Sequence, residues 1–438
     1  MNRQRDYDVI VIGAGAAGLL AAARAAARGR RVLLLEKNRK AGVKILMSGG
    51  ARCNITQETD AAGIIAAFGP AGRFLHSPLA AFSPRALRDF FHAQGVPTKV
   101  EASGKVFPVS DKAVDVRDAL VAWLRRAGGE LSLAEAVTDL RREGDGFVVE
   151  TSHGWPGPTT FRRRLNVAQF RRRLDVGRVI VTTGGRSYPG CGTTGDGYAW
   201  LATMGHAIRP PRPALTPLTS HETWLQGLAG VTLPDVSLSV WPPLAKKPPA
   251  QKPRPAIVRR GSLLFTHFGL SGPAAMDVSR EVTKAASARG VVLQIDFLPD
   301  VTDQCLKKQL AQSLAAFGKR LIAHCLPEAL PKSLASALVH KSSIPSDRRA
   351  SQFSKPERLR LLANLKACEV ILSGTRGFGK AEVTAGGVDL AEVDSRNMQS
   401  KLVPGLFLAG EILDLDGFIG GYNFQAAFST GYLAGSSV

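Results

Sequence analysis

The motif Gly-Ala-Gly-Ala-Ala-Gly at residues 13–18 constrains the fold of this chain more than any other feature. It follows a short apolar run, Tyr7 to Ile12, and precedes an alanine-rich stretch, so a strand, a tight turn and a helix are expected. Gly13 permits the turn, Gly15 lets the backbone approach a diphosphate, and Gly18 allows close packing of the helix on the strand. The motif therefore predicts a Rossmann-type βαβ beginning.

An acidic residue completes this pattern at the end of the second expected strand, Arg31 to Glu36. Glu36 lies eighteen residues after Gly18, close to the spacing of about 20 expected for a ribose-binding acid. Its carboxylate can accept hydrogen bonds from both ribose hydroxyls of an adenosine, and the helix N-terminus supplies amide donors for the diphosphate. These residues predict a dinucleotide site, without separating FAD from NAD.

Later segments favour FAD. Val179 to Gly185 and Pro404 to Glu411 both read as strands that end in small residues, the second with a terminal acid for a ribityl chain. Gly420-Gly421-Tyr422-Asn423 precedes a helical stretch and is expected to present amides to the pyrimidine edge of a flavin. No second dinucleotide fingerprint is evident, since the glycines between Gly374 and Gly379 have the wrong spacing for one. The chain therefore has no evident resident NAD(P)H domain, and NAD(P)H is expected to bind only transiently as a reductant.

The cysteines and histidines exclude several classes of protein. The five cysteines form no Cys-x-x-Cys pair, which argues against a disulfide framework, a zinc knuckle and a dithiol reductase. The eight histidines form no ligand-spaced cluster, so no metal is expected. The run from Val9 to Ala23 imitates a signal peptide, but acidic residues precede it and it is short for a membrane span. A cytoplasmic protein without a membrane segment is expected; the oligomeric state stays open.

The order of the predicted elements indicates a split domain. Glycine-rich α/β sequence occupies the start and the end of the chain, whereas the middle is rich in proline, then in short β-like runs, then in helical sequence. We therefore expect an α/β fold in which a split Rossmann-like FAD-binding domain of the two-dinucleotide-binding type carries an inserted β-barrel-like plus helical module. The expected boundaries are 1–208 and 373–438 for the FAD-binding domain, 209–302 for the β-rich subdomain and 303–372 for the helical subdomain.

Positive charge is concentrated in two places. The chain of 438 residues has 57 Lys and Arg against 36 Asp and Glu, a net charge of +21. Residues 209–372 contribute +12 and the arginine-rich stretch 162–173 contributes +6. Such surfaces attract polyanions, nucleic acid first among them, although solvated charge favoured by a GC-rich genome gives the same composition. The candidate RNA-binding cations are Arg162, Arg163, Arg164, Arg171, Arg172, Arg173, Lys246, Lys247, Arg259 and Arg260.

Several longer motifs resemble one family. Residues 44–54 (KILMSGGARCN), 104–110, 264–273, 382–388 and 410–423 look like the hallmarks of the BaiN/RdsA flavoprotein family, also described as YhiN-like or aminoacetone-oxidase-like FAD-binding enzymes. The matches span nearly the whole chain, whereas stretches 162–173 and 242–255 depart from the pattern. The resemblance implies a split FAD-binding domain with an insert that is part β-barrel-like and part helical.

The resemblance also implies a function. Some relatives reduce a uridine in large-subunit ribosomal RNA to dihydrouridine, and others are linked to bile-acid or aminoacetone redox chemistry. We expect an FAD-dependent oxidoreductase reduced by NAD(P)H and acting on ribosomal RNA; a small-molecule enzyme and a non-catalytic flavin-bearing RNA-binding factor stay open. The expected cofactor-binding residues are Gly13, Gly15, Ala16, Ala17, Gly18, Glu36, Lys37, Lys44, Ser48, Gly49, Gly50, Arg52, Cys53, Asn54, Val137, Thr183, Gly184, Gly185, Gly410, Glu411, Gly420, Gly421, Tyr422 and Asn423.

Reduction of a double bond also requires a proton donor. Cys53 is the first candidate, and the neighbouring Arg52 is expected to lower the pKa of its thiol; the alternative is a small buried thiol that packs near FAD. His267 in the insert is the second candidate, against the alternative of a structural histidine. Lys44 and Arg52 are expected to neutralise a flavin phosphate or the substrate.

Overall fold

The computed structural model describes residues 6–153, 171–241, 254–285 and 289–438. It contains two compact units: a Rossmann unit, Met1–Pro213 with Glu382–Val438, and an insert unit, Ala214–Ala381. The first unit contains both ends of the chain, so the mixed α/β fold with a split Rossmann-like domain is confirmed. The expected internal boundary of the insert at residue 302 stays a proposal. Arg162, Arg163, Arg164, Lys246 and Lys247 lie outside the described residues.

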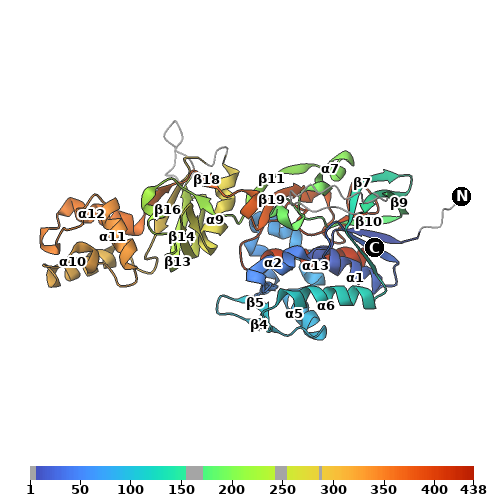
Figure 1. Ribbon diagram of the computed structural model, residues 1–438, viewed down its shortest axis with the longest axis horizontal. Coiled ribbons are helices and arrows are strands. Elements are labelled where there is room, and N and C mark those ends of the chain that lie inside the picture. The colour runs from blue at the N-terminus through green and yellow to red at the C-terminus, as the bar shows by residue number, and fades with distance from the viewer. Residues whose placement is uncertain (1–5, 154–170, 242–253, 286–288) are drawn as a thin grey trace, which may run out of the picture. The chain divides into compact units, whose positions relative to one another are not determined.

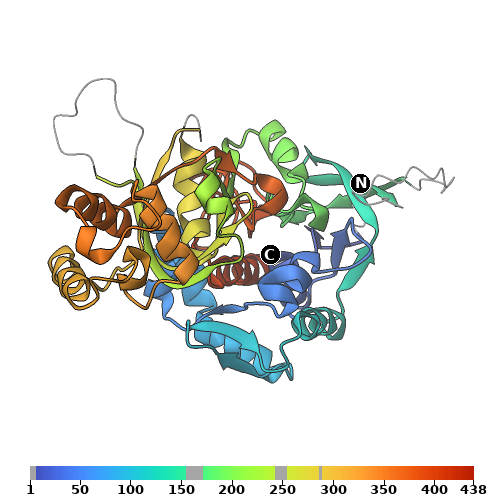
Figure 2. The ribbon, with the colours of Figure 1, turned by 60° about the vertical axis from the view of Figure 1, so that its left-hand side comes forward.

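A five-stranded parallel sheet forms the centre of the Rossmann unit, in the order β20-β10-β1-β2-β6 (Figures 1 and 2). Its central pairs are in register, with Ile10 opposite both Val179 and Leu33. The strands β1, β2 and β20 are buried throughout, and β10 is buried after its first residue, Arg178, as expected for a sheet covered on both faces. The bounds are β1 Val9–Ile12, β2 Val32–Glu36, β6 Glu130–Leu133, β10 Arg178–Val181 and β20 Leu406–Leu408.

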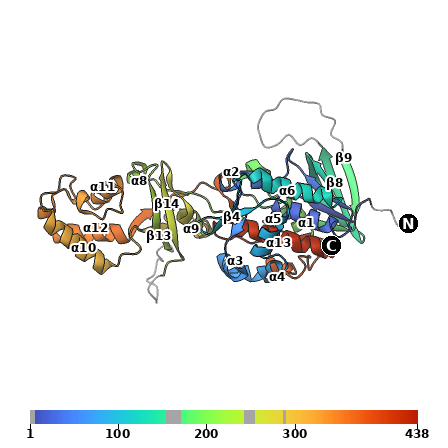
Figure 3. The same cartoon turned by 90° about the horizontal axis from the view of Figure 1, so that it is seen from below.

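Helices from the two ends of the chain pack closely against each other beside this sheet. Helices α1 (Ala16–Ala26) and α13 (Tyr422–Ser437) lie side by side in Figures 1 and 3. A Cβ atom on Gly431 would lie 2.3 Å from the carbonyl oxygen of Ala17, so only glycine permits this approach. The other helices are α2 Val43–Ala51, α3 Ala61–Ala67, α4 His76–Ala81, α5 Pro84–Ala93, α6 Ala113–Arg126 and α7 Asp196–Thr203.

Three smaller sheets complete the Rossmann unit. The antiparallel sheet β7-β8-β9 contains a tight turn at residues 143–146, with Gly144 at a φ of +61°. The strands are β3 Thr56–Gln57, β4 Thr98–Val100 and β5 Lys105–Pro108; β7 Glu135–Glu143, β8 Gly146–His153 and β9 Arg171–Val176; and β11 Ile208–Ala214 with β19 Val383–Val388. Among the described residues, no helix is both long and apolar enough to cross a bilayer.

The insert unit is built on a seven-stranded antiparallel sheet with the order β17-β16-β13-β14-β15-β12-β18. Its two edge strands, β17 and β18, are separated by only Leu372 and Ser373. Because so short a link spans only about 10 Å, the sheet must curl until its edges approach each other. This confirms the barrel-like part of the predicted fold. The strands are β12 Leu218–Thr219, β13 Thr232–Trp241, β14 Ile257–Thr266, β15 Gly269–Ser271, β16 Val292–Asp296, β17 Cys368–Ile371 and β18 Gly374–Thr375.

The helices of the insert follow the predicted pattern, with most of them between residues 303 and 366. Leu306, Leu334 and Leu361, one from each of three helices, are fully buried in the same core as the sheet. Figure 1 shows these three helices together, next to β16. The bounds are α8 Thr223–Gln226, α9 Pro273–Lys284, α10 Asp303–Ala316, α11 Lys332–Lys341 and α12 Lys355–Lys366.

Candidate functional site

The three glycines of the 13–18 motif each have the environment that the sequence predicts. Gly13 has a φ of +100°, and a Cβ there would lie 2.7 Å from the carbonyl oxygen of Thr182. A Cβ on Gly18 would lie 1.8 Å from the carbonyl oxygen of Gly13. At Gly15, by contrast, a Cβ would have no neighbour within 4 Å. Gly13 and Gly18 therefore close the turn, and Gly15 leaves open space beside the backbone.

This open space lies at the N-terminus of α1, where Gly15 is the capping residue and provides no side chain to bond the first amides. The first amides of a helix, here beginning near Ala16 and Ala17, have no acceptor within the helix and carry a partial positive charge. The carboxyl ends of β1, β2, β10 and β20 meet at the same edge of the sheet. The geometry fits the diphosphate of a dinucleotide.

Glu36 lies at this edge and is 8% exposed. Its Oε2 accepts a hydrogen bond from the amide of Ala14 at 2.8 Å, and its Oε1 accepts two from Asn38, each at 2.8 Å. Burial raises the pKa of Glu36, and these hydrogen bonds oppose the rise. The carboxylate is thereby fixed in position, with lone pairs left for a ribose hydroxyl. Lys37 instead pairs with Asp196 of α7.

The segment from Ser48 to Cys53 contains an unusual backbone. Helix α2 is interrupted at Ser48, and Gly49 and Gly50 have φ values of +56° and +69°. Ala51 and Cys53, which have side chains, are also left-handed, with φ of 66° and 63°. Such conformations cost free energy and persist where the surroundings impose them, often at ligand sites. A Cβ on Gly50 would meet nothing within 4 Å, so this loop presents open backbone.

Cys53 differs from its predicted state. The residue is 0% exposed, and burial raises the pKa of its thiol to about 12. Arg52 does not lower it, because its guanidinium pairs with Glu101 at 2.6 Å and lies over the Phe107 ring at 4.0 Å. The prediction of a lowered pKa is therefore wrong. Asn54, beside it, is 9% exposed, and its Oδ1 has no hydrogen-bond partner in the described part of the chain.

Lys44 and Glu411 form an ion pair that joins distant parts of the chain. Lys44 Nζ also donates to Ser187 Oγ at 2.6 Å, and Ser187 Oγ donates to the Glu411 carboxylate. The amide of Thr384 donates to Glu411 Oε1 at 2.9 Å. We expected Lys44 to neutralise a flavin phosphate or the substrate, whereas in the structure it pairs with Glu411.

Ser187 and Thr384 were missed by the sequence analysis. Thr384 Oγ1 accepts hydrogen bonds from the amides of Arg186, at 2.8 Å, and Ser187, at 3.0 Å. A Cβ on Gly185 would lie 2.3 Å from Thr384 Oγ1, so the glycine permits this contact. Ser187 follows the glycine pair at 184–185, and Thr384 precedes the glycine pair at 386–387. These two pairs are the sequence signal that could have indicated both residues.

Three more predicted cofactor residues follow strands of the parallel sheet at this edge: Thr183 and Gly184 after β10, and Gly410 after β20. A Cβ on Gly410 would lie 2.9 Å from Cβ of Ala17, next to the start of α1. The φ of Gly184 is +72°, and Thr183 Oγ1 has no partner among the described residues. Val137 lies on β7, beside the shift in register between residues 137 and 139.

Helix α13 begins at another crowded glycine. Gly421 has a φ of +94°, and a Cβ there would lie 2.5 Å from the carbonyl oxygen of Thr56; Gly420 has a φ of +136°. Gly421 is the N-cap residue of α13 and provides no side chain to cap the helix. The side chain of Asn423 bonds the backbone of Gly417 at 2.8 Å and holds the preceding loop.

The predicted RNA-binding cations are mostly paired where they are described. Arg173 pairs with Glu143 at 2.8 Å, Arg259 with Asp277 at 3.0 Å and Arg260 with Asp300 at 2.6 Å. Arg171 and Arg172 are exposed on β9. His267 is exposed at the tip of the β14–β15 hairpin, in the insert unit. In the described ranges, no group of three His, Cys, Asp or Glu residues is placed to hold a metal ion.

Comparison with known proteins places these residues in a family. The family model described as the HI0933-like protein Rossmann domain matches residues 7–437. The chain is 34% identical over 429 residues to a ribosomal RNA dihydrouridine synthase of Escherichia coli (strain K12), covering 97% of this chain and 96% of that protein. It is 31% identical over 431 residues to the Haemophilus influenzae protein of the same name, covering 98% of each.

A third relative has a different name. The 3-dehydro-bile acid delta(4,6)-reductase of Clostridium scindens is 30% identical over 429 residues, covering 97% of each chain. These full-length matches confirm the resemblance that the motifs indicate. The chain belongs to the HI0933-like Rossmann-domain family, and it is an oxidoreductase.

Proposed function

We propose that this protein binds FAD, is reduced by NAD(P)H, and reduces the uracil 5,6 double bond of a uridine in large-subunit ribosomal RNA to give dihydrouridine. The observation that carries the proposal is the 34% identity, over 97% of the chain, to a ribosomal RNA dihydrouridine synthase. The open backbone at Gly15 and the fixed Glu36 support the cofactor. A ribosomal RNA substrate would place the protein in the cytoplasm.

In this proposal, backbone amides and two carboxylates hold the cofactor. The first amides of α1 bind the diphosphate, and the space beside Gly15 admits it. Glu36 accepts hydrogen bonds from the adenosine ribose, and Glu411, held by Lys44 and the amide of Thr384, accepts from the ribityl chain. The first amides of α13 stabilise negative charge on the pyrimidine edge of the flavin. When bound, FAD supplies the hydride that adds to one carbon of the substrate double bond.

The other carbon takes a proton, for which the chain offers two candidates. Cys53 keeps its proton at neutral pH, because burial raises the pKa of its thiol to about 12, and at 0% exposure its Sγ needs local movement to reach a substrate. His267 is exposed on the insert. Loss of turnover in Cys53→Ser or His267→Gln, with FAD content unchanged, would assign the donor.

The decisive experiment uses the purified, FAD-loaded protein with NADH or NADPH and ribosomal RNA from a strain in which the gene is deleted. Mass spectrometry of nuclease fragments should show one uridine that gains two hydrogen atoms, and the same uridine should lack them in the deletion strain. An unchanged dihydrouridine pattern in that strain would remove the RNA substrate. A protein that never becomes yellow and takes up no added FAD would remove the cofactor.

A second candidate function is reduction of a small molecule, and the 30% identity to a 3-dehydro-bile acid delta(4,6)-reductase favours it. Both relatives' names describe reduction of a carbon–carbon double bond, so the same cofactor chemistry would serve. Turnover of an unsaturated steroid ketone without RNA, together with an unchanged RNA pattern, would select this function. Bound FAD that NAD(P)H does not reduce, together with no turnover of either substrate class, would instead indicate a non-catalytic RNA-binding factor.

A further inference from the structure

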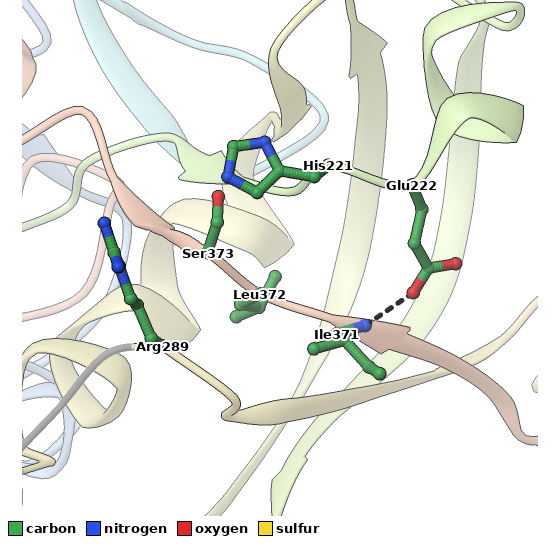
Figure 4. Close-up of a pocket in the computed structure, with 6 residues that line it drawn as sticks. All are labelled: His221, Glu222, Arg289, Ile371, Leu372 and Ser373. Carbon is green, nitrogen blue, oxygen red and sulfur yellow. Dashed lines mark hydrogen bonds between the residues drawn. The ribbon is translucent and has the colours of Figure 1, made fainter.

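The seam of the insert barrel contains an open cavity of about 450 Å³. It lies where the edge strand β17 ends and the chain continues into β18, through Leu372 and Ser373. Figure 4 shows the six residues that line it: His221, Glu222, Arg289, Ile371, Leu372 and Ser373. All of them belong to the insert unit, whereas Gly15 belongs to the Rossmann unit.

The acidic residue of the cavity is already neutralised. Glu222 Oε1 accepts a hydrogen bond from the amide of Ile371 at 2.7 Å, and Oε2 pairs with Lys341 at 2.9 Å. In Figure 4 its carboxylate turns toward Ile371 and away from His221. Burial works against its charge, but these partners hold the pKa of Glu222 below its usual range. Besides Glu222, the lining has an imidazole, a hydroxyl and the guanidinium of Arg289, and most of its accessible surface is apolar.

An aromatic platform adjoins this cavity. The guanidinium of Arg376 lies over the ring of Phe268, 4.5 Å from its centroid, and His267 meets that ring edge-on at 5.0 Å. The amide of Ser220 donates to the carbonyl of Phe268 at 3.1 Å, and His221 is the next residue, so the backbones of Phe268 and His221 come close after the end of β12. Arg376 is bonded at the other end of this strand, where its amide donates to the carbonyl of Pro217 at 2.9 Å, and its side chain reaches the Phe268 ring. Arg376 and His267 are exposed.

We propose that this seam surface, defined by Phe268, Arg376 and the cavity at His221 and Ser373, binds a single-stranded segment of the substrate RNA. Aromatic rings and guanidinium planes stack on unpaired bases, which is how proteins commonly hold single-stranded RNA. Here the guanidinium of Arg376 is exposed, and the half-buried Phe268 ring lies beneath it. The +12 net charge of residues 209–372 favours a polyanion. The inference rests on the proposed function, because that function supplies the RNA.

The seam surface differs from the RNA-binding surface that the positions of the lysines and arginines in the sequence indicate. Arg259 and Arg260 are paired with carboxylates, so they add little accessible charge. At the seam, the carboxylate of Glu222 pairs with Lys341 and accepts a hydrogen bond from the amide of Ile371. The guanidinium of Arg376 lies over the Phe268 ring. Stacking tolerates any base, so this surface would guide the strand and leave the choice of uridine to the active site.

Direct binding tests the surface. FAD-loaded, full-length protein is titrated into a fluorescent, uridine-rich single-stranded oligonucleotide, and anisotropy gives the Kd. Phe268→Leu removes the ring but keeps apolar volume, and it should weaken binding about tenfold, whereas Phe268→Tyr should bind like wild type. Arg376→Gln should weaken binding and reduce the salt dependence by about one phosphate contact. A duplex of the same sequence should bind less tightly than the single strand.

A matched control lies in the same unit. Arg320 lies over the ring of Phe317 at 4.1 Å, and this ring is 39% exposed, but the pair is formed by neighbours on the helical part. The variant Phe317→Leu/Arg320→Gln removes the same chemistry and should leave RNA affinity unchanged. Melting temperatures of all variants confirm that they are folded. Equal affinity of Phe268→Leu, Arg376→Gln and wild type would overturn the inference, as would equal losses in the control.

The failure of this inference is distinguishable from failure of the proposed function. If wild type makes dihydrouridine while the seam variants bind and react normally, the surface is wrong and the function stands. If wild type binds RNA through the seam and makes no dihydrouridine, the surface stands and the proposed reaction is wrong. A seam that selectively captures a protein partner and not RNA would also overturn the inference.

Discussion

Helices α1 and α12 begin in opposite ways. Helix α12, in the insert unit, has a capping box: the hydroxyl of Ser354 accepts from the amide of Glu357, and the Glu357 carboxylate accepts from the amide of Ser354 at 2.9 Å. Helix α1 begins after Gly15, which provides no side chain. The capped end satisfies its own amides, whereas the uncapped end, beside open space, needs a ligand to do so. The comparison separates a helix end that serves stability from one that serves binding.

The sharpest test of this comparison uses two glycines of one motif. Gly18→Ala would place a methyl group 1.8 Å from the carbonyl oxygen of Gly13 and should destabilise the fold by on the order of 3–5 kcal/mol. Gly15→Ala meets nothing within 4 Å and has an allowed backbone, so it should cost less than about 1 kcal/mol. Chemical denaturation and FAD titration measure both. Because its methyl fills the open space, Gly15→Ala should nevertheless lose at least tenfold in FAD affinity; unchanged affinity would show that no diphosphate lies there.

The next largest contrast is between two thiols. Cys53 in the Rossmann unit is 0% exposed with a pKa raised to about 12, whereas Cys305 in the insert is exposed. Because the thiolate is the reactive form, iodoacetamide at pH 8 should alkylate Cys305 at least 100-fold faster than Cys53. Peptide mapping by mass spectrometry measures the two rates, and Cys305→Ser serves as a control. Rapid alkylation of Cys53 in folded protein would contradict its burial.

Two half-buried ion pairs, one in each unit, give a smaller effect. Lys44–Glu411 has side-chain exposures of 26% and 18%, and Lys341–Glu222 has 21% and 22%. Lys44→Met and Lys341→Met should each cost about 1–3 kcal/mol, because each leaves a carboxylate without its cation. Only Lys44→Met should weaken FAD binding, because it removes the cation that holds the carboxylate of Glu411 in position. Equal FAD affinities in the two variants would remove Glu411 from the cofactor site.

The smallest effect is expected at the capped helix. Ser354→Ala should destabilise the protein by about 1 kcal/mol at pH 7 and leave FAD affinity unchanged. Hydrogen bonds from Ser354 hold the pKa of Glu357 below its usual range. That stabilisation is therefore present above the unfolded-state pKa of about 4.3 and is lost as the pH falls through the lower folded-state value. The difference in free energy of unfolding between the variant and wild type should be smaller at pH 3 than at pH 7. A difference that does not change with pH would contradict the capping box.

The parts of the molecule that could be predicted from the sequence depend on local spacing. The strand, turn and helix around Gly15, and Glu36 at the end of β2, follow from residues within a short stretch of chain. The meeting of the chain ends could also be predicted, because β20 has the pattern of a buried parallel strand. The barrel-like insert came from the family resemblance, and the two-residue link at Leu372 explains its curvature physically.

The parts that could not be predicted depend on which distant side chain a charge meets. Arg52 is adjacent to Cys53 in sequence but pairs with Glu101, so adjacency gave the wrong pKa direction. Ser187 lies far from Glu411 in the chain, and only the fold brings its hydroxyl to that carboxylate. Arg260 counts as a free cation in composition, whereas its pairs with Asp235 and Asp300 offset its charge.

The pairing of β20 with β10 has a consequence for how the molecule is made. Val179 of β10 pairs with Leu406 of β20, and between them the ribosome must translate the entire insert. The nascent chain therefore emerges with an incomplete sheet, and Glu411 is made only after the whole insert. Cofactor loading should consequently follow synthesis of β20, and a stalled chain ending before residue 404 should acquire no flavin.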